Sequence, residues 1–136
     1  MSFIYPMFAL VILTFIIGFS TGLIRFMSVQ KGLVNRQYFN VLSGYSAPDT
    51  MVKFGRNFDN LFEMPLLFYT LGVIVIALNI NNELMFALGW AFVALRMVHS
   101  IIHVTYNNPI HRFLAFFSSS IIVLIMWIKL IFIVSQ

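Results

Sequence analysis

The sequence predicts an all-α fold, an integral membrane bundle of four transmembrane helices. Apolar residues occupy 61% of the 136 positions and charged residues only 9%, and the mean hydropathy is +0.97. A soluble domain is about half apolar and about a quarter charged, so this composition excludes one. The apolar residues gather in stretches that are each long enough for the roughly 20-residue helix that crosses a bilayer. The stretches do not alternate with polar residues, which favours helices over a barrel.

The four predicted spans follow one another in a single domain that covers residues 1–136. No basic segment precedes the first span and no small-residue cleavage site follows its apolar run, so we expect it to remain in the protein rather than to be removed as a signal peptide. The second span opens with charged residues and is fully apolar in its second half. The predicted bounds of the spans are residues 3–27, 54–80, 84–106 and 113–134.

The connections between the spans predict how the chain is oriented in the membrane. The first loop is the longest and contains Lys31, Arg36 and Lys53, whereas the second is a tight turn without Lys or Arg. The third loop is short and carries Arg112. The first and third loops of a four-span protein share one side, so the positive-inside rule places both in the cytoplasm and both termini outside. Lys129 weakly opposes this orientation, and we expect its side chain to snorkel.

Composition also argues against several classes of function. The net charge is +4, but the basic residues form no stripe of the kind that binds nucleic acid. The chain has no cysteine, which excludes a disulfide framework, a thiolate metal site and a cysteine nucleophile. His99 and His103 have a spacing that can chelate a metal from one helix. No carboxylate or thiolate supports them, so we expect hydrogen-bonding histidines and no metal site.

Ionisable side chains within the spans are clustered at one depth. The second span carries three polar residues at positions i, i+4 and i+7, which share one helix face. The third span carries three more at i, i+3 and i+7, and one arginine flanks each of the other spans. Charges inside a membrane need a partner or a water-filled cavity, so the two stripes are expected to face each other or a neighbouring subunit. The residues of this set are Arg25, Arg56, Asn60, Glu63, Arg96, His99, His103 and Arg112.

Structural roles also fit some of these residues. Arg56 and Glu63 can form an ion pair that only pins helices together, since polar groups stabilise helix association in membranes. Arg25 and Arg112, at the ends of spans, can serve as topology anchors. Pro65 follows Glu63 closely and is expected to kink the second span and free backbone carbonyls nearby.

The same residues resemble a known family. Residues 56–65, with Arg, Asn and Glu at i, i+4 and i+7 followed by proline, resemble the second-helix signature of the MAPEG proteins, the membrane-associated proteins in eicosanoid and glutathione metabolism. Residues 95–103 resemble the third-helix segment of the microsomal prostaglandin E synthase branch. Residues 21–25 resemble the end of the family's first helix, and Arg112 falls where the family places its activating arginine. The resemblance covers essentially the whole chain and suggests a bacterial-type member related to microsomal glutathione transferase.

The resemblance implies a function, an assembly and a location. It implies a homotrimer embedded in membrane lipid, and we expect this membrane to be the bacterial inner membrane. Each site would lie between adjacent subunits and would be open to a lipophilic small-molecule substrate. Arg112 would be the catalytic residue that stabilises the thiolate of glutathione. Arginines pair well with the two carboxylates of glutathione and a glutamate with its ammonium. The expected glutathione-binding residues are Arg25, Arg56, Asn60, Glu63, Arg96, His99 and His103.

Two departures from the family pattern leave other functions open. Met64 and His103 stand where related members have tyrosines, and the loss of these hydroxyls weakens ordinary glutathione placement. One alternative is therefore a non-catalytic member that keeps the fold and binds lipid-like ligands or partner enzymes. Another is a small proton-coupled exporter that uses Glu63, although Arg56 on the same face would hold that carboxylate ionised.

Overall fold

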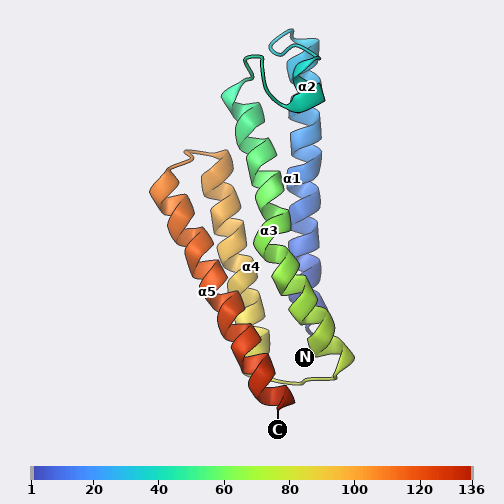
Figure 1. Ribbon diagram of the computed structural model, residues 1–136, viewed down its shortest axis with the longest axis vertical. Coiled ribbons are helices and arrows are strands. Elements are labelled where there is room, and N and C mark those ends of the chain that lie inside the picture. Colours follow the sequence, from blue (N-terminus) through green and yellow to red (C-terminus); the bar gives the residue numbers. More distant parts are fainter. Residues whose placement is uncertain (1, 136) are drawn as a thin grey trace.

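The computed structural model describes residues 2–135, which form helices and no strand. Figure 1 shows the four long helices side by side, each antiparallel to the next. All four are long and apolar enough to cross a membrane, which confirms the predicted fold class and makes the chain an integral multi-pass membrane protein. The helices are α1 (Ile4–Gln30), α2 (Tyr38–Val41), α3 (Asp49–Ala77), α4 (Glu83–Val104) and α5 (Pro109–Val134).

The bundle consists of two helix pairs, because α1 packs mainly on α3 and α4 mainly on α5. Between the pairs, the ring of Phe68 is fully buried and stacks on Phe92 with 4.5 Å between centroids. Two glycines allow α1 to approach closely. A Cβ atom at Gly89 would lie 2.9 Å from the ring of Phe3, and one at Gly72 would lie 2.5 Å from a methionine sulfur of α1. The outward faces of α1 and α5 are rich in exposed Phe and Ile side chains, as expected for helices in contact with lipid.

Two helices begin four or five residues earlier than the sequence predicted, and a proline marks each of these starts. The second span was expected from residue 54, but α3 begins at Asp49, directly after Pro48. The fourth span was expected from residue 113, but α5 begins at Pro109. The side chain of Asn108 accepts hydrogen bonds from the backbone N–H groups of the next turn, and proline is favoured at the first helical position. Arg112 therefore lies in the first turn of α5 rather than in a loop.

The end of α1 reverses the direction of the chain. Leu33 donates its N–H to the carbonyl of Ser28 at 2.9 Å, and Gly32 donates to Val29 at 3.0 Å. These two bonds form a Schellman motif, in which Gly32 takes the left-handed conformation with φ of +67°. The reversed segment leads into the short helix α2, which the sequence analysis did not predict and which lies beside the end of α1 (Figure 1).

The cap of α4 provides a local test of the fold. The side chain of Asn82 accepts a hydrogen bond of 3.0 Å from the N–H of Met85. Replacing Asn82 by alanine removes this bond, so we expect the free energy of unfolding to fall by about 1 kcal/mol. Thermal unfolding in detergent would measure the change. The exposed neighbour Asn81 is a matched control, and Asn81→Ala should change stability by less than about 0.5 kcal/mol.

Candidate functional site

The polar residues of the spans lie in the half of the bundle that leads to the α1–α3 and α4–α5 connections (Figure 1). They form two groups, one between α1 and α3 and the other between α4 and α5. The α1–α3 group contains Arg25 and Arg56, and the α4–α5 group contains His99, His103 and Arg112.

The α1–α3 group forms a small polar pocket. Arg25 of α1 and Arg56 and Asp59 of α3 line this pocket, which has a volume of about 200 Å³. Gly55 lets the two helices approach here, because a Cβ atom at this position would lie 3.2 Å from Nη2 of Arg25. Tyr38 of α2 also lines the pocket. Two guanidinium groups and one carboxylate therefore meet at this end of the groove between α1 and α3.

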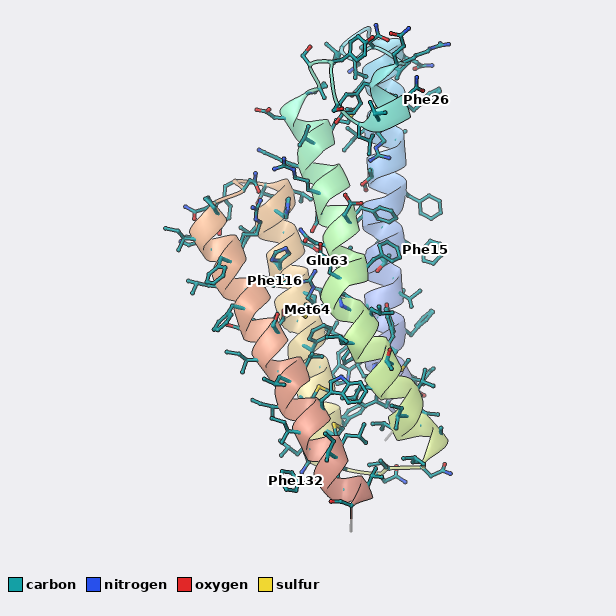
Figure 2. The ribbon with its side chains drawn as sticks, in the orientation of Figure 1. Phe15, Phe26, Glu63, Met64, Phe116 and Phe132 are labelled. Carbon is teal, nitrogen blue, oxygen red and sulfur yellow. The ribbon has the colours of Figure 1, made fainter. Side chains whose placement is uncertain are left out.

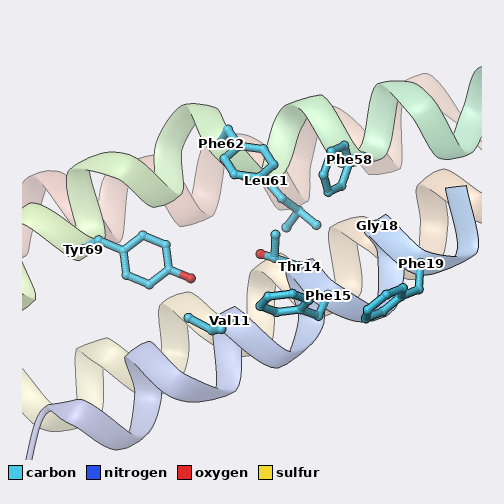
Figure 3. Close-up of a pocket in the computed structure, with 9 residues that line it drawn as sticks. All are labelled: Val11, Thr14, Phe15, Gly18, Phe19, Phe58, Leu61, Phe62 and Tyr69. Carbon is cyan, nitrogen blue, oxygen red and sulfur yellow. The ribbon is translucent and has the colours of Figure 1, made fainter. Parts of the chain in front are cut away.

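The same groove becomes apolar farther along the two helices (Figure 3). An open cavity of about 520 Å³ lies there, and aromatic side chains of both helices form most of its walls. Figure 3 shows the Tyr69 hydroxyl pointing towards Thr14, the two polar side chains in this lining. The cavity is lined by Val11, Thr14, Phe15, Gly18, Phe19, Phe58, Leu61, Phe62 and Tyr69. Gly55 lines the polar pocket and Phe58, one turn farther along α3, lines the apolar cavity, so the two are neighbours along this helix.

The α4–α5 group is centred on Arg112. Nη1 of Arg112 donates a hydrogen bond to Oδ1 of Asn107 at 2.7 Å and lies 3.4 Å from Nε2 of His103. Nδ1 of His99 lies 3.0 Å from the backbone carbonyl of Arg112 and donates to it. This bond fixes the tautomer of His99, because only a protonated Nδ1 can donate to a carbonyl. The two histidines of α4 therefore hold the first turn of α5 and its arginine in place.

Arg96 joins the two groups from inside the bundle. Its side chain is fully buried, and Nη2 donates to the backbone carbonyl of Asn60 on α3 at 2.7 Å. Its guanidinium carbon lies 5.6 Å from the centroid of the Phe116 ring on α5, within the range of a cation–π interaction. Among the described residues, Nε and Nη1 find no hydrogen-bond partner. Pro65 cannot donate to the carbonyl of Leu61, so the bond from Arg96 lies next to the position where α3 lacks an internal donor.

Glu63 and Asn60 lie on α3 between the two groups. Asn60 is half-buried, whereas Glu63 is exposed on the single chain. The Glu63 carboxylate is within electrostatic range of Arg96, and Arg56 is within electrostatic range of His103. Figure 2 places Glu63, Met64 and Phe116 at nearly the same level of the bundle. The exposed carboxylate of Glu63 is therefore available to a ligand or to a second chain.

The structure brings some of the predicted residues together and keeps others apart. His99, His103 and Arg112 are in direct contact, and Arg25 shares a pocket with Arg56. Within residues 2–135, the side-chain hydrogen bonds of Arg112 go to His103 and Asn107 and not to α1 or α3. In the described part of the chain, no group of three or more His, Asp or Glu side chains is arranged to hold a metal ion.

Four further polar or aromatic residues belong to this region and were not predicted. Asn107 and Phe116 contact the arginines directly. Asn57 and Ser100 are buried, and their side-chain polar atoms have no partner within residues 2–135. The buried position of Asn57 could have been noticed in the sequence, because Asn57 shares the helix face of Leu61 and other core residues, where an amide is unusual. Asn107 could not be assigned, because its partner is set by the geometry of the α4–α5 turn.

Comparison with known proteins identifies one family. The model of the MAPEG family matches residues 3–132, which is nearly the whole chain. No curated protein and no solved structure matches the chain. The assignment therefore comes from the family pattern as a whole.

Proposed function

Because the chain belongs to the MAPEG family, we propose that it is a glutathione-dependent transferase or peroxidase that acts on a lipophilic electrophile within the membrane. The observation that carries this proposal is the groove between α1 and α3. At one end it holds the guanidinium groups of Arg25 and Arg56, and next to them lies an apolar cavity of about 520 Å³. A charged thiol peptide and an apolar second substrate would meet at the boundary between these two regions.

The charged residues suit glutathione in number and sign. Arg25 and Arg56 would pair with its two carboxylates, since a guanidinium binds a carboxylate through two parallel hydrogen bonds. Glu63, exposed on the same face of α3 as Arg56, would bind the ammonium group. Asn60 lies between them and can donate from its amide. Arg96 is buried, so it would act through the Asn60 carbonyl and by its charge.

The size of the polar pocket supports a site shared between subunits. Its volume of about 200 Å³ is below the roughly 300–1,000 Å³ of typical ligand pockets. One chain would therefore supply only part of the site. We propose that the protein is a homotrimer in which a neighbouring copy brings its α4–α5 group to the exposed face of α3. This arrangement would place Arg112 and His99 of one copy opposite Glu63 of another.

Arg112 is the residue proposed to activate the thiol. Glutathione supplies the sulfur nucleophile, because the chain has no cysteine, and a nearby guanidinium favours the thiolate form. Both recorded side-chain bonds of Arg112 use Nη1, which leaves Nη2 and Nε to face the sulfur. Asn107 and His103 would fix the guanidinium in that orientation. For the membrane orientation, we propose the bacterial inner membrane with the site end of the bundle in the cytoplasm.

Isothermal titration of the purified protein with glutathione tests the proposal. We expect binding at millimolar or lower ligand concentration, and we expect Arg56→Ala to raise Kd about tenfold or more, because it removes a charge-assisted pair. Lys129→Ala removes a positive charge near the opposite end of the bundle and should leave Kd unchanged. If millimolar glutathione produces no binding heat with the wild-type protein, the proposed activity is wrong.

A second candidate is a non-catalytic, lipid-binding member of the family. It is favoured by the contact of His103 with Arg112, since His103 stands where related members have a tyrosine, and by the large apolar cavity between α1 and α3. This candidate predicts a stable protein without turnover on a panel of electrophiles and hydroperoxides. A proton-coupled exporter would instead show uptake into proteoliposomes that depends on a pH gradient and is lost in Glu63→Gln.

A further inference from the structure

A second groove with two arginines lies at the end of α1. Of its lining residues, only Arg25 also belongs to the proposed glutathione site. We call this second groove the α1–α2 groove. It has a volume of about 540 Å³, which lies within the roughly 300–1,000 Å³ of typical ligand pockets. Its lining includes Gly22, Arg25, Phe26, Val29, Arg36 and Phe39.

The groove is formed by the chain reversal after α1. The Schellman motif at Gly32 turns the chain back, and the buried side chain of Val34 anchors the reversed segment. Arg36 and Phe39 of this segment then line the groove together with residues from the last turns of α1. Figure 1 shows α2 lying beside this end of α1. Two segments separated by a tight turn thus line one groove.

The groove combines two positively charged side chains with a mostly apolar lining. The two arginines come from different segments, Arg25 from α1 and Arg36 from the segment before α2, and no Asp or Glu of residues 2–135 lines the groove. The remaining lining is mostly apolar, and Phe26 is 60% exposed on the outer face of α1 (Figure 2). The groove lies where the long apolar surface of α1 ends. A ligand that fits it has an anionic head group and an apolar chain.

We propose that the α1–α2 groove binds the head group of an anionic phospholipid. The phosphate lies between Arg25 and Arg36, since arginine binds phosphate through two parallel hydrogen bonds, and an acyl chain follows Gly22 and Phe26 along α1. Basic pockets at the membrane surface recognise anionic head groups in this way. A zwitterionic lipid fits less well, because its cationic group would lie beside two guanidinium groups. Arg25 also belongs to the proposed glutathione set, whereas Arg36 lines only the α1–α2 groove, so Arg36 is the residue that tests the lipid site by itself.

Native mass spectrometry of the full-length protein tests this site. The protein in neutral detergent would be titrated with dioleoyl phosphatidylglycerol and, separately, with dioleoyl phosphatidylcholine. We expect phosphatidylglycerol to bind with a Kd about tenfold lower, and Arg36→Gln to remove most of this preference, because one charge-assisted bidentate contact is worth about a factor of ten or more. Arg36→Lys keeps the charge but loses the planar fork, so it should retain part of the preference.

Lys31→Gln is the matched control, because Lys31 is an exposed cation at the same end of α1 but does not line the groove. If Lys31→Gln and Arg36→Gln weaken phosphatidylglycerol binding equally, the preference comes from general surface charge and the proposed site is wrong. Displacement of the lipid by millimolar inorganic phosphate would also overturn it, because the site would then recognise phosphate alone. Glutathione titration of Arg36→Gln should match the wild type, which separates a failure of the lipid site from a failure of the proposed function.

Discussion

Replacing Arg112 by alanine is expected to lower the turnover number for glutathione conjugation about 10²–10³-fold, as found when one group that stabilises a reacting anion is removed. The Kd of glutathione should change less than tenfold, because Arg25, Arg56 and Glu63 would still hold the peptide. Steady-state turnover with a chlorodinitrobenzene substrate would give the first quantity and isothermal titration the second. The ultraviolet absorbance band of the bound thiolate, followed against pH as a difference from the ligand-free protein, would show directly whether the thiol ionises less readily in the variant.

Two further variants separate the charge of Arg112 from its structural contacts. Arg112→Lys keeps the charge but not the planar guanidinium, so we expect an intermediate turnover number. His111→Ala changes the adjacent residue, whose exposed ring contacts Tyr106 and not Arg112, and should leave turnover unchanged. An Arg112→Ala protein that loses affinity and turnover by the same factor would contradict the proposed role, because Arg112 would then only hold the ligand.

The four spans were predictable because hydropathy and length decide them. Each observed long helix overlaps its predicted span over most of its length. The positions of the helix starts depended on side-chain capping and on proline instead. Asn108 and Pro109 start α5 four residues before the predicted start, and α3 starts five residues early after Pro48. The short helix α2 was missed because it has only four residues and no hydrophobic periodicity can be read from so short a segment.

For the candidate site, helical periodicity predicted which residues share a face but not where each face points. Arg56 and Glu63 are exposed on the single chain, whereas Arg96 is fully buried. The sequence did not distinguish these cases, since the rotation of each helix about its axis is set by packing. Gly55 illustrates the limit, because its importance lies in the close approach of Arg25, and such an approach leaves no periodic signal.

Replacing Arg96 by methionine is expected to keep or raise the stability of the protein while lowering its activity. Arg96 is fully buried, and its Nε and Nη1 lack hydrogen-bond partners in the part of the chain that the structure describes. A buried charge with incomplete pairing is often replaced by an apolar side chain of similar volume at no loss of stability, or with a gain. The midpoint of thermal unfolding in detergent should therefore equal or exceed that of the wild type, even though the Asn60 carbonyl loses its donor.

The catalytic activity of the Arg96→Met protein should fall, in contrast to its stability. Without Arg96, α3 loses the bond that holds the Asn60 carbonyl at 2.7 Å, and the carboxylate of Glu63 loses a nearby positive charge. A displacement of about 1 Å at a reacting centre can cost about 10²-fold in rate, so we expect a loss of that order in turnover. Lys129→Met removes a distant positive charge and should change neither quantity. A large fall in the unfolding midpoint with activity retained would show that Arg96 only joins helices. The expected result would instead mean that this interior cation is kept because it positions the glutathione-binding face of α3.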